Sequence, residues 1–186
     1  RLVRHETTPW GRITRVNPFP TDKRNIPARA LAFGGWTAVS TLEGAISRSE
    51  PDVVLAMSPP LPIGLAGWAV AQLRRVPFVF NIQDVFPDVA VELGLLTGAK
   101  VIRAASMLER FSYRRADAVT VLSDDLAANV RAKVARGGAA RPGGAGDPAK
   151  VHVIPNFVDT ERIQPADPDN AYRAEHGLTG KRVVMY

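Results

Sequence analysis

The stretch from Phe78 to Asp88, FVFNIQDVFPD, decides the fold class, because it passes abruptly from apolar to polar residues. Its first five residues, Phe78–Ile82, read as a strand that is buried on both faces. Gln83 and Asp84 follow at once, and Pro87 comes three residues after Asp84. In an open α/β sheet, ligands bind beyond the carboxyl ends of the strands. A carboxylate at this position is therefore a candidate binding group.

Short apolar strands alternate with helices on both sides of this stretch. We expect further strands at 12–16, 52–57, 117–122, 150–154 and 182–186, and helices at 25–48, 63–75, 100–115, 124–136 and 171–178, with a loop and short helix in 84–96. The alternation predicts an α/β fold, with a parallel sheet and helices on both of its faces. On helix 100–115 we expect a buried stripe made of Val101, Ala104, Ala105, Leu108 and Phe111. The glycine-rich segment 137–149 is expected to be a surface loop.

The formal net charge of +6 makes an anionic partner plausible. Nucleic acid, an acidic membrane and a phosphorylated small molecule all qualify, and surface arginines that only keep the protein soluble are the plain alternative. The arginines are spread over several helices and aromatic residues make up only 7%, which disfavours nucleic acid. There is no cysteine, and His5, His152 and His176 are far apart. We therefore expect no disulfide, no metal site and no cofactor.

The segment Val53–Leu73 has no charged residue and is long enough to span a membrane. Pro59, Pro60 and Pro62 fall in its first half, where each would remove a backbone donor from a helix. A strand, a proline loop and a buried helix explain this segment better than a membrane span.

Polar residues follow four of the predicted strands, whose last residues are Met57, Ile82, Leu122 and Ile154. If these four strands end at one edge, the candidate site residues are Ser58, Pro59, Gln83, Asp84, Ser123 and Asn156, with Asp84 as the catalytic candidate. Each has a structural alternative. Ser58 can simply shape its proline loop, Ser123 can cap a helix, and Asn156 can form a turn. Asp84 can also cap the short helix, although Pro87 lacks the N–H that a capping bond would need.

Several catalytic motifs are absent from the sequence. It contains no G-x-G-x-x-G or phosphate-binding P-loop pattern in the required context, and no G-x-S-x-G elbow. No histidine lies near a candidate serine in the sequence, so nothing indicates an activated serine.

Four stretches together resemble the amino-terminal domain of family 4 glycosyltransferases with the GT-B fold. They are PDVVLAMSPPLPIGLAGWAVAQLRRVPFVFNIQDVFPD (51–88), LERFSYRRADAVTVLSDDL (108–126), KVHVIPNFVDTERIQP (150–165) and GKRVVMY (180–186). The resemblance is closest to the subgroup that builds cell-surface polysaccharides, including fucosaminyltransferase-like enzymes. It implies a Rossmann-like, acceptor-binding domain at 1–163, followed at 164–186 by a link and the first strand of a donor-binding domain.

The same resemblance implies a retaining, metal-free transfer from a nucleotide-sugar donor to a glycan or lipid-linked acceptor. The position of Asp84 matches a residue near the reacting sugar, and the Asn156 loop would line the cleft near the hinge. The family's first strand and glycine-rich loop would lie before Arg1, and most of the donor domain after Tyr186. We therefore expect the chain to be an internal piece of the enzyme that is inactive by itself. A nucleotide-sugar epimerase of the same fold and a non-catalytic binding module remain alternatives.

The segment Trp10–Trp36 mixes basic with aromatic residues, which suits an anionic lipid surface. Its members are Arg12, Arg15, Lys23, Arg24 and Arg29 among Trp10, Phe19, Phe33 and Trp36. An ordinary solvated helix face with core aromatics explains the pattern equally well. With the resemblance, it predicts a cytoplasmic protein with peripheral contact to the inner face of the plasma membrane.

Overall fold

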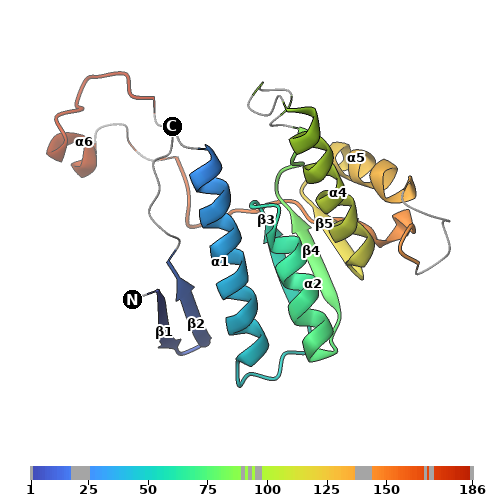
Figure 1. Cartoon of the computed structure of the whole chain (residues 1–186). Coiled ribbons are helices and arrows are strands. Elements are labelled where there is room, and N and C mark those ends of the chain that lie inside the picture. Colours follow the sequence, from blue (N-terminus) through green and yellow to red (C-terminus); the bar gives the residue numbers. More distant parts are fainter. Residues whose placement is uncertain are drawn as a thin grey trace. The chain divides into compact units, whose positions relative to one another are not determined.

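The computed structural model describes residues 2–17, 26–88, 91, 94, 98–136, 144–165, 167 and 170–184 (Figure 1). The chain divides into two compact units, Arg1–Pro155 and Asn156–Tyr186. The domain boundary that the sequence suggests, between residues 163 and 164, remains a prediction.

The first unit begins with an antiparallel hairpin of β1 (Val3–Thr8) and β2 (Gly11–Val16). The Arg15 Nε donates a hydrogen bond to the Glu6 carboxylate across this pair, at 3.1 Å. The sequence predicts only the second strand. The first was missed because Val3 is the only apolar residue of β1, so that no alternation marks it as a strand.

Four parallel strands form the main sheet of the first unit. They are β3 (Val54–Ser58), β4 (Phe78–Ile82), β5 (Ala118–Val121) and β6 (Val151–Val153), in the order β3-β4-β5-β6. Ala56 pairs with Phe80, and Phe80 with Val119, so the carboxyl ends of the strands meet at one edge. The predicted parallel α/β sheet is thereby confirmed, and so is the common edge, which we call the carboxyl edge.

Helices α2 (Ile63–Arg74), α4 (Ala99–Arg115) and α5 (Asp124–Ala135) connect these strands, and α1 (Ile26–Ile46) precedes them. Because the strand order follows the chain order, right-handed crossovers place all three connecting helices on one face. The sequence pattern predicts helices on both faces. On the face away from α2, Leu55 and Met57 of β3 are 60% and 53% exposed. The difference arises because sequence periodicity does not reveal the strand order.

The core lies between this helix layer and the sheet. Phe78, Phe80 and Ile82 of β4 alternate into it and are at most 1% exposed. Helix α2 can approach closely because Gly67 has no side chain. A Cβ atom at Gly67 would lie 2.5 Å from the Phe78 Cε2 and 2.8 Å from the Ala56 Cβ. The glycine therefore sets how near α2 lies to β3 and β4.

The buried face of α4 differs from the predicted stripe. Its buried residues are Glu109, Ser112 and Tyr113, while Val101 of the predicted stripe is 56% exposed. The Tyr113 ring packs on Phe80, with ring centroids 6.1 Å apart. The apolar pattern predicts the wrong face because Glu109, which pairs with Lys133, occupies a core position on this helix.

None of the described helices combines the length and the hydropathy that a membrane crossing requires. Residues 54–74 instead form β3, a proline-containing turn and α2, which excludes the membrane-span alternative. The predicted short helix in 84–96 and the predicted loop 137–149 lie largely outside the described residues. A short 3₁₀ helix, η1 (Pro148–Lys150), precedes β6.

The second unit contains one short helix, α6 (Ala171–Glu175), among its described residues. The Asn170 side chain caps it by accepting a hydrogen bond from the Arg173 backbone N–H at 3.1 Å. This helix is shorter than the predicted 171–178. Residues 182–184 are not in a strand, and the remainder of the strand predicted at 182–186 lies outside the described residues.

Candidate functional site

The loops after β3 and β4 touch at the carboxyl edge. The Gln83 backbone N–H donates to the Ser58 carbonyl at 3.2 Å. Ser58 is only 2% exposed, whereas Pro59 beside it is exposed. The structure thus brings the candidate residues after β3 next to Gln83 after β4. Ser58 is buried in a structural position, and Pro59 lies at the surface.

Asp84 is exposed at this edge, and its side chain makes no hydrogen bond or ion pair with any described residue. Residues that follow Asp84 in the loop are buried. Val85 is 4% exposed and Pro87 is fully buried, so the loop is held from both positions. The described residues therefore give no support to a helix-capping role, and they present the Asp84 carboxylate to solvent.

Ser123 is the N-cap of α5. Its Oγ accepts a hydrogen bond from the Leu126 backbone N–H at 3.3 Å. The structural alternative for this residue is confirmed. Ser123 also follows β5 closely, so the helix that it caps begins at the carboxyl edge.

Asn156 is exposed and is the first residue of the second unit, so its position relative to the other candidates is not defined. The chain reaches it from the carboxyl edge, because the Ile154 backbone N–H still pairs with the Val121 carbonyl at 2.8 Å. The sheet therefore gathers the ends of β3, β4 and β5, represented by Ser58, Gln83 with Asp84, and Ser123.

A row of polar side chains runs toward this edge on the sheet face away from the helices. The Gln83 Nε2 donates to the Asn81 Oδ1 at 2.5 Å, and the Asn81 Nδ2 donates to the Thr120 Oγ1 at 2.8 Å. This row orients the Gln83 amide next to Asp84. Sequence reasoning did not identify it, although Asn81 within an apolar strand is a visible signal.

A second polar cluster holds the far end of the loop that carries Asp84. The Lys133 Nζ lies 2.8 Å from the Asp88 Oδ2 and 2.7 Å from the Glu109 Oε1. The Asn129 Nδ2 also donates to Asp88, at 3.2 Å, and the Tyr113 hydroxyl donates to Glu109 at 3.0 Å. The cluster connects the loop to both α4 and α5.

Burial dominates the electrostatics of this cluster. Glu109 is 2% exposed, and its burial raises the pKa of the carboxyl despite the hydrogen bond from Lys133. Burial likewise raises the pKa of the Tyr113 hydroxyl, with the Glu109 charge adding to the effect. The tyrosine therefore stays protonated as a donor to Glu109.

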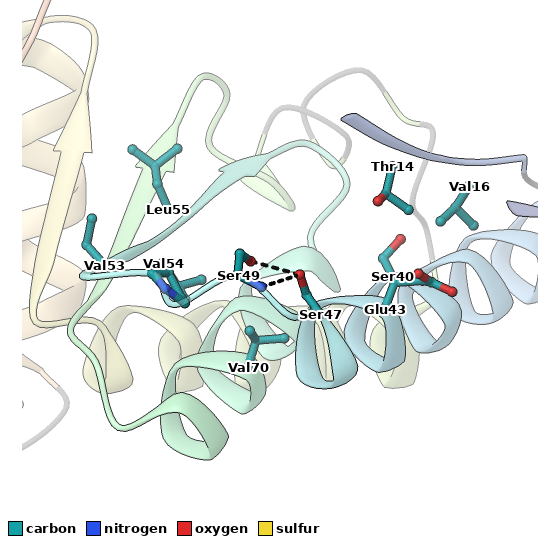
Figure 2. Close-up of a pocket in the computed structure, with 12 residues that line it drawn as sticks. Thr14, Val16, Ser40, Glu43, Ser47, Ser49, Val53, Val54, Leu55 and Val70 are labelled. Atoms are coloured by element: carbon teal, nitrogen blue, oxygen red, sulfur yellow. Dashed lines mark hydrogen bonds between the residues drawn. The ribbon is translucent and has the colours of Figure 1, made fainter. Parts of the chain in front are cut away.

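A cavity of about 390 Å³ lies elsewhere, between β2, α1 and the edge strand β3 (Figure 2). Figure 2 shows Thr14 reaching it from β2 and Glu43 from α1, with Ser49 bonded to Ser47 beside it. None of the predicted site residues lines it. Among the described residues, no group of three or more acidic or histidine side chains is placed to hold a metal ion.

A model of the glycosyl transferase 4-like domain family matches residues 1–156. No curated protein matches the chain. The matched range contains the four-stranded sheet and the candidate residues at the carboxyl edge, and its last position is Asn156.

Proposed function

Because the chain belongs to the glycosyl transferase 4-like domain family, we propose that it is the acceptor-binding domain of a retaining glycosyltransferase. In this proposal the donor is a nucleotide sugar, and the acceptor is a glycan or a lipid-linked glycan. The enzyme would serve cell-surface polysaccharide synthesis, as the fucosaminyltransferase-like stretches of the sequence suggest. The donor would bind mainly to a second domain that follows this one.

The observation that carries the proposal is the Asp84 carboxylate, exposed at the carboxyl edge on a loop that is held by buried neighbours. Glycosyl transfer needs a group that orients or deprotonates the acceptor hydroxyl while a diphosphate leaves an oxocarbenium-like centre. An exposed carboxylate that has no side-chain partner among the described residues is suited to that hydroxyl. Ligands of open α/β sheets bind beyond this same edge. We assign Asp84 the acceptor-facing role.

The test is sugar transfer by the two-domain enzyme that contains this chain, using a panel of nucleotide sugars. Asp84→Asn keeps the size of the side chain and removes its charge. If Asp84 accepts the proton, turnover falls by about a hundredfold, the usual scale for an acid–base group. The matched control is Asp52→Asn, because Asp52 is exposed at the opposite end of β3. It should leave turnover unchanged.

Turnover of Asp84→Asn within about threefold of the wild type would contradict the assignment, since acid–base groups contribute far more. If the leaving phosphate takes the proton instead, Asp84 only orients the acceptor, and the loss appears mainly in the acceptor KM. The same assay without acceptor tests the epimerase alternative. Release of a free, epimerised sugar nucleotide would replace transfer as the proposed reaction.

We further propose that the domain contacts an anionic membrane from the cytoplasmic side. The supporting observation is Trp10, which is 77% exposed at the turn between β1 and β2, next to the exposed Arg12. Leu31 of α1 is also 80% exposed. Phe19, Lys23 and Arg24 of the predicted segment lie outside the described residues. Sedimentation with vesicles tests this contact, and equal binding to neutral and anionic lipid would contradict its electrostatic basis.

A further inference from the structure

Four arginines line one cavity at the end of the sheet opposite the carboxyl edge. Arg110, Arg114 and Arg115 come from the last turns of α4, and Arg136 comes from the end of α5. The cavity has a volume of about 570 Å³. Because β5 begins just after α4 ends, this cavity lies at the amino end of β5 and is separate from the Asp84 site.

These arginines have no acidic partner in the part of the chain that the structure describes. None of the four forms an ion pair there. The carboxylates close by in sequence bind other groups. Glu109, next to Arg110, pairs with Lys133 at 2.7 Å. Asp117 accepts from the Phe78 N–H at 2.7 Å, and Asp147 accepts from the Ala149 N–H at 2.9 Å. The sequence between Arg136 and Gly144 contains no acidic residue.

Helix dipoles account for only part of this charge. The carboxyl ends of α4 and α5 each contribute roughly half a negative charge, which makes about one in total against four guanidinium groups. Lys150 already binds the carboxyl end of α4, because its Nζ donates to the Ala116 carbonyl at 2.9 Å. The cavity is therefore left with an excess of positive charge that an anion would neutralise.

The cavity also has a guanidinium beside two aromatic rings and an apolar wall. The Arg115 guanidinium carbon lies 5.4 Å from the Trp68 ring centroid and 5.5 Å from that of Phe111. These cation–π contacts attract the guanidinium to the two rings, and its N–H donors remain able to bind an anion. Phe111 lines the cavity together with Met107, which is 60% exposed.

We propose that this cavity binds a phosphate ester. Its oxygens would accept hydrogen bonds from the guanidinium groups, and its organic part would lie against Met107 and Phe111. Arginine suits this ligand because its planar fork matches two phosphate oxygens at once. The ester is either a soluble metabolite or the headgroup of an anionic lipid.

The experiment compares the 186-residue chain with the double variant Arg110→Gln/Arg136→Gln. Calorimetric titration with inorganic phosphate and phenyl phosphate tests the soluble source. Sedimentation with phosphatidylcholine vesicles, with and without phosphatidylglycerol, tests the lipid source. Arg103→Gln is the matched control, because Arg103 is exposed on the same helix but does not line the cavity. Thermal unfolding of each variant confirms that it is folded.

We expect the double variant to weaken binding by at least about tenfold, as two charge-assisted contacts are lost, and Arg103→Gln to change it less than about twofold. Weakened phenyl phosphate binding identifies a soluble ester, and weakened vesicle binding alone identifies a headgroup. Binding that is equal in the wild type and in the folded double variant, or absent for every probe, overturns the proposal.

Discussion

Lys133 of α5 and Asp88 of the loop after β4 are joined by an ion pair of 2.8 Å. The same Nζ atom lies 2.7 Å from Glu109 of α4. One ammonium group therefore connects two helices to the loop that carries Asp84. The Lys133 side chain is 17% exposed and that of Glu109 2%, so these two groups meet largely out of water, whereas the Asp88 side chain is 36% exposed. Removing one charge of such a buried ion pair leaves the other without compensation, which destabilises the folded protein.

Lys133→Met should destabilise the protein by about 3–5 kcal/mol at neutral pH, because it leaves the buried Glu109 carboxylate without its cation. Urea denaturation measures the change in the free energy of unfolding. Lys100→Met, at an exposed position near the start of α4, is the control and should stay within about 0.5 kcal/mol. A similar small loss for Lys133→Met would show that the pair contributes little.

Glu109→Gln should reveal a specific pH dependence. The folded-state pKa of Glu109 is raised above its ordinary value of 4.5. The folded protein thus holds this proton more tightly than the unfolded chain. Relative to the variant, the wild type should be most stable below pH 4.5 and lose stability as the pH rises through the raised pKa. Urea denaturation of both proteins over a pH series gives the free energy of unfolding of the wild type relative to the variant. If this relative stability increased with pH, the pKa of Glu109 would be lowered in the folded state and not raised.

Gly67→Ala should destabilise the protein by about 1–3 kcal/mol, because the new methyl group would overlap the Phe78 ring and the Ala56 side chain. Gly34→Ala provides the control, since a Cβ there meets nothing within 4 Å. In the interior of α1 it should stabilise by about 0.5–1 kcal/mol. Thermal unfolding of both variants checks the prediction, and opposite signs of the two shifts are the expected result.

Ser123→Ala should cost about 1 kcal/mol of stability through loss of the N-cap bond to Leu126, whereas Ser123→Asp should preserve the cap. Chemical denaturation of the two variants measures this difference. Equal losses would mean that the cap bond contributes nothing. If Ser123 also contacts substrate, transfer by the stable Ser123→Asp variant would still be reduced.

The sheet was predictable because its strands are short apolar runs that end on polar residues, as Phe78–Ile82 does before Gln83. The arrangement of the helices was not, since nothing in the local pattern states that β3, β4, β5 and β6 pair in chain order. Strand β1 escaped detection for another reason. Its polar residues are ordered by cross-strand contacts such as that between Glu6 and Arg15, which only the folded hairpin shows.

At the candidate site, the sequence placed Ser58, Asp84 and Ser123 at the ends of parallel strands, and the structure puts these strand ends on one edge. It did not reveal the cluster of Glu109 and Lys133, which are 24 residues apart and meet only because α4 packs on α5. A lone glutamate on the inward face of a helix was the available signal. Charge partners across helices follow from packing and not from spacing.

A protein whose strands pair in the order of their synthesis can build its sheet while it leaves the ribosome. β3 is synthesised before β4, so β4 can pair with it at once. β5 can then pair with β4, and β6 with β5. Within the described sheet each strand pairs with the one made before it, so no strand has to insert between two earlier ones. The strand order of the described sheet thus permits vectorial assembly, from β3 toward β6.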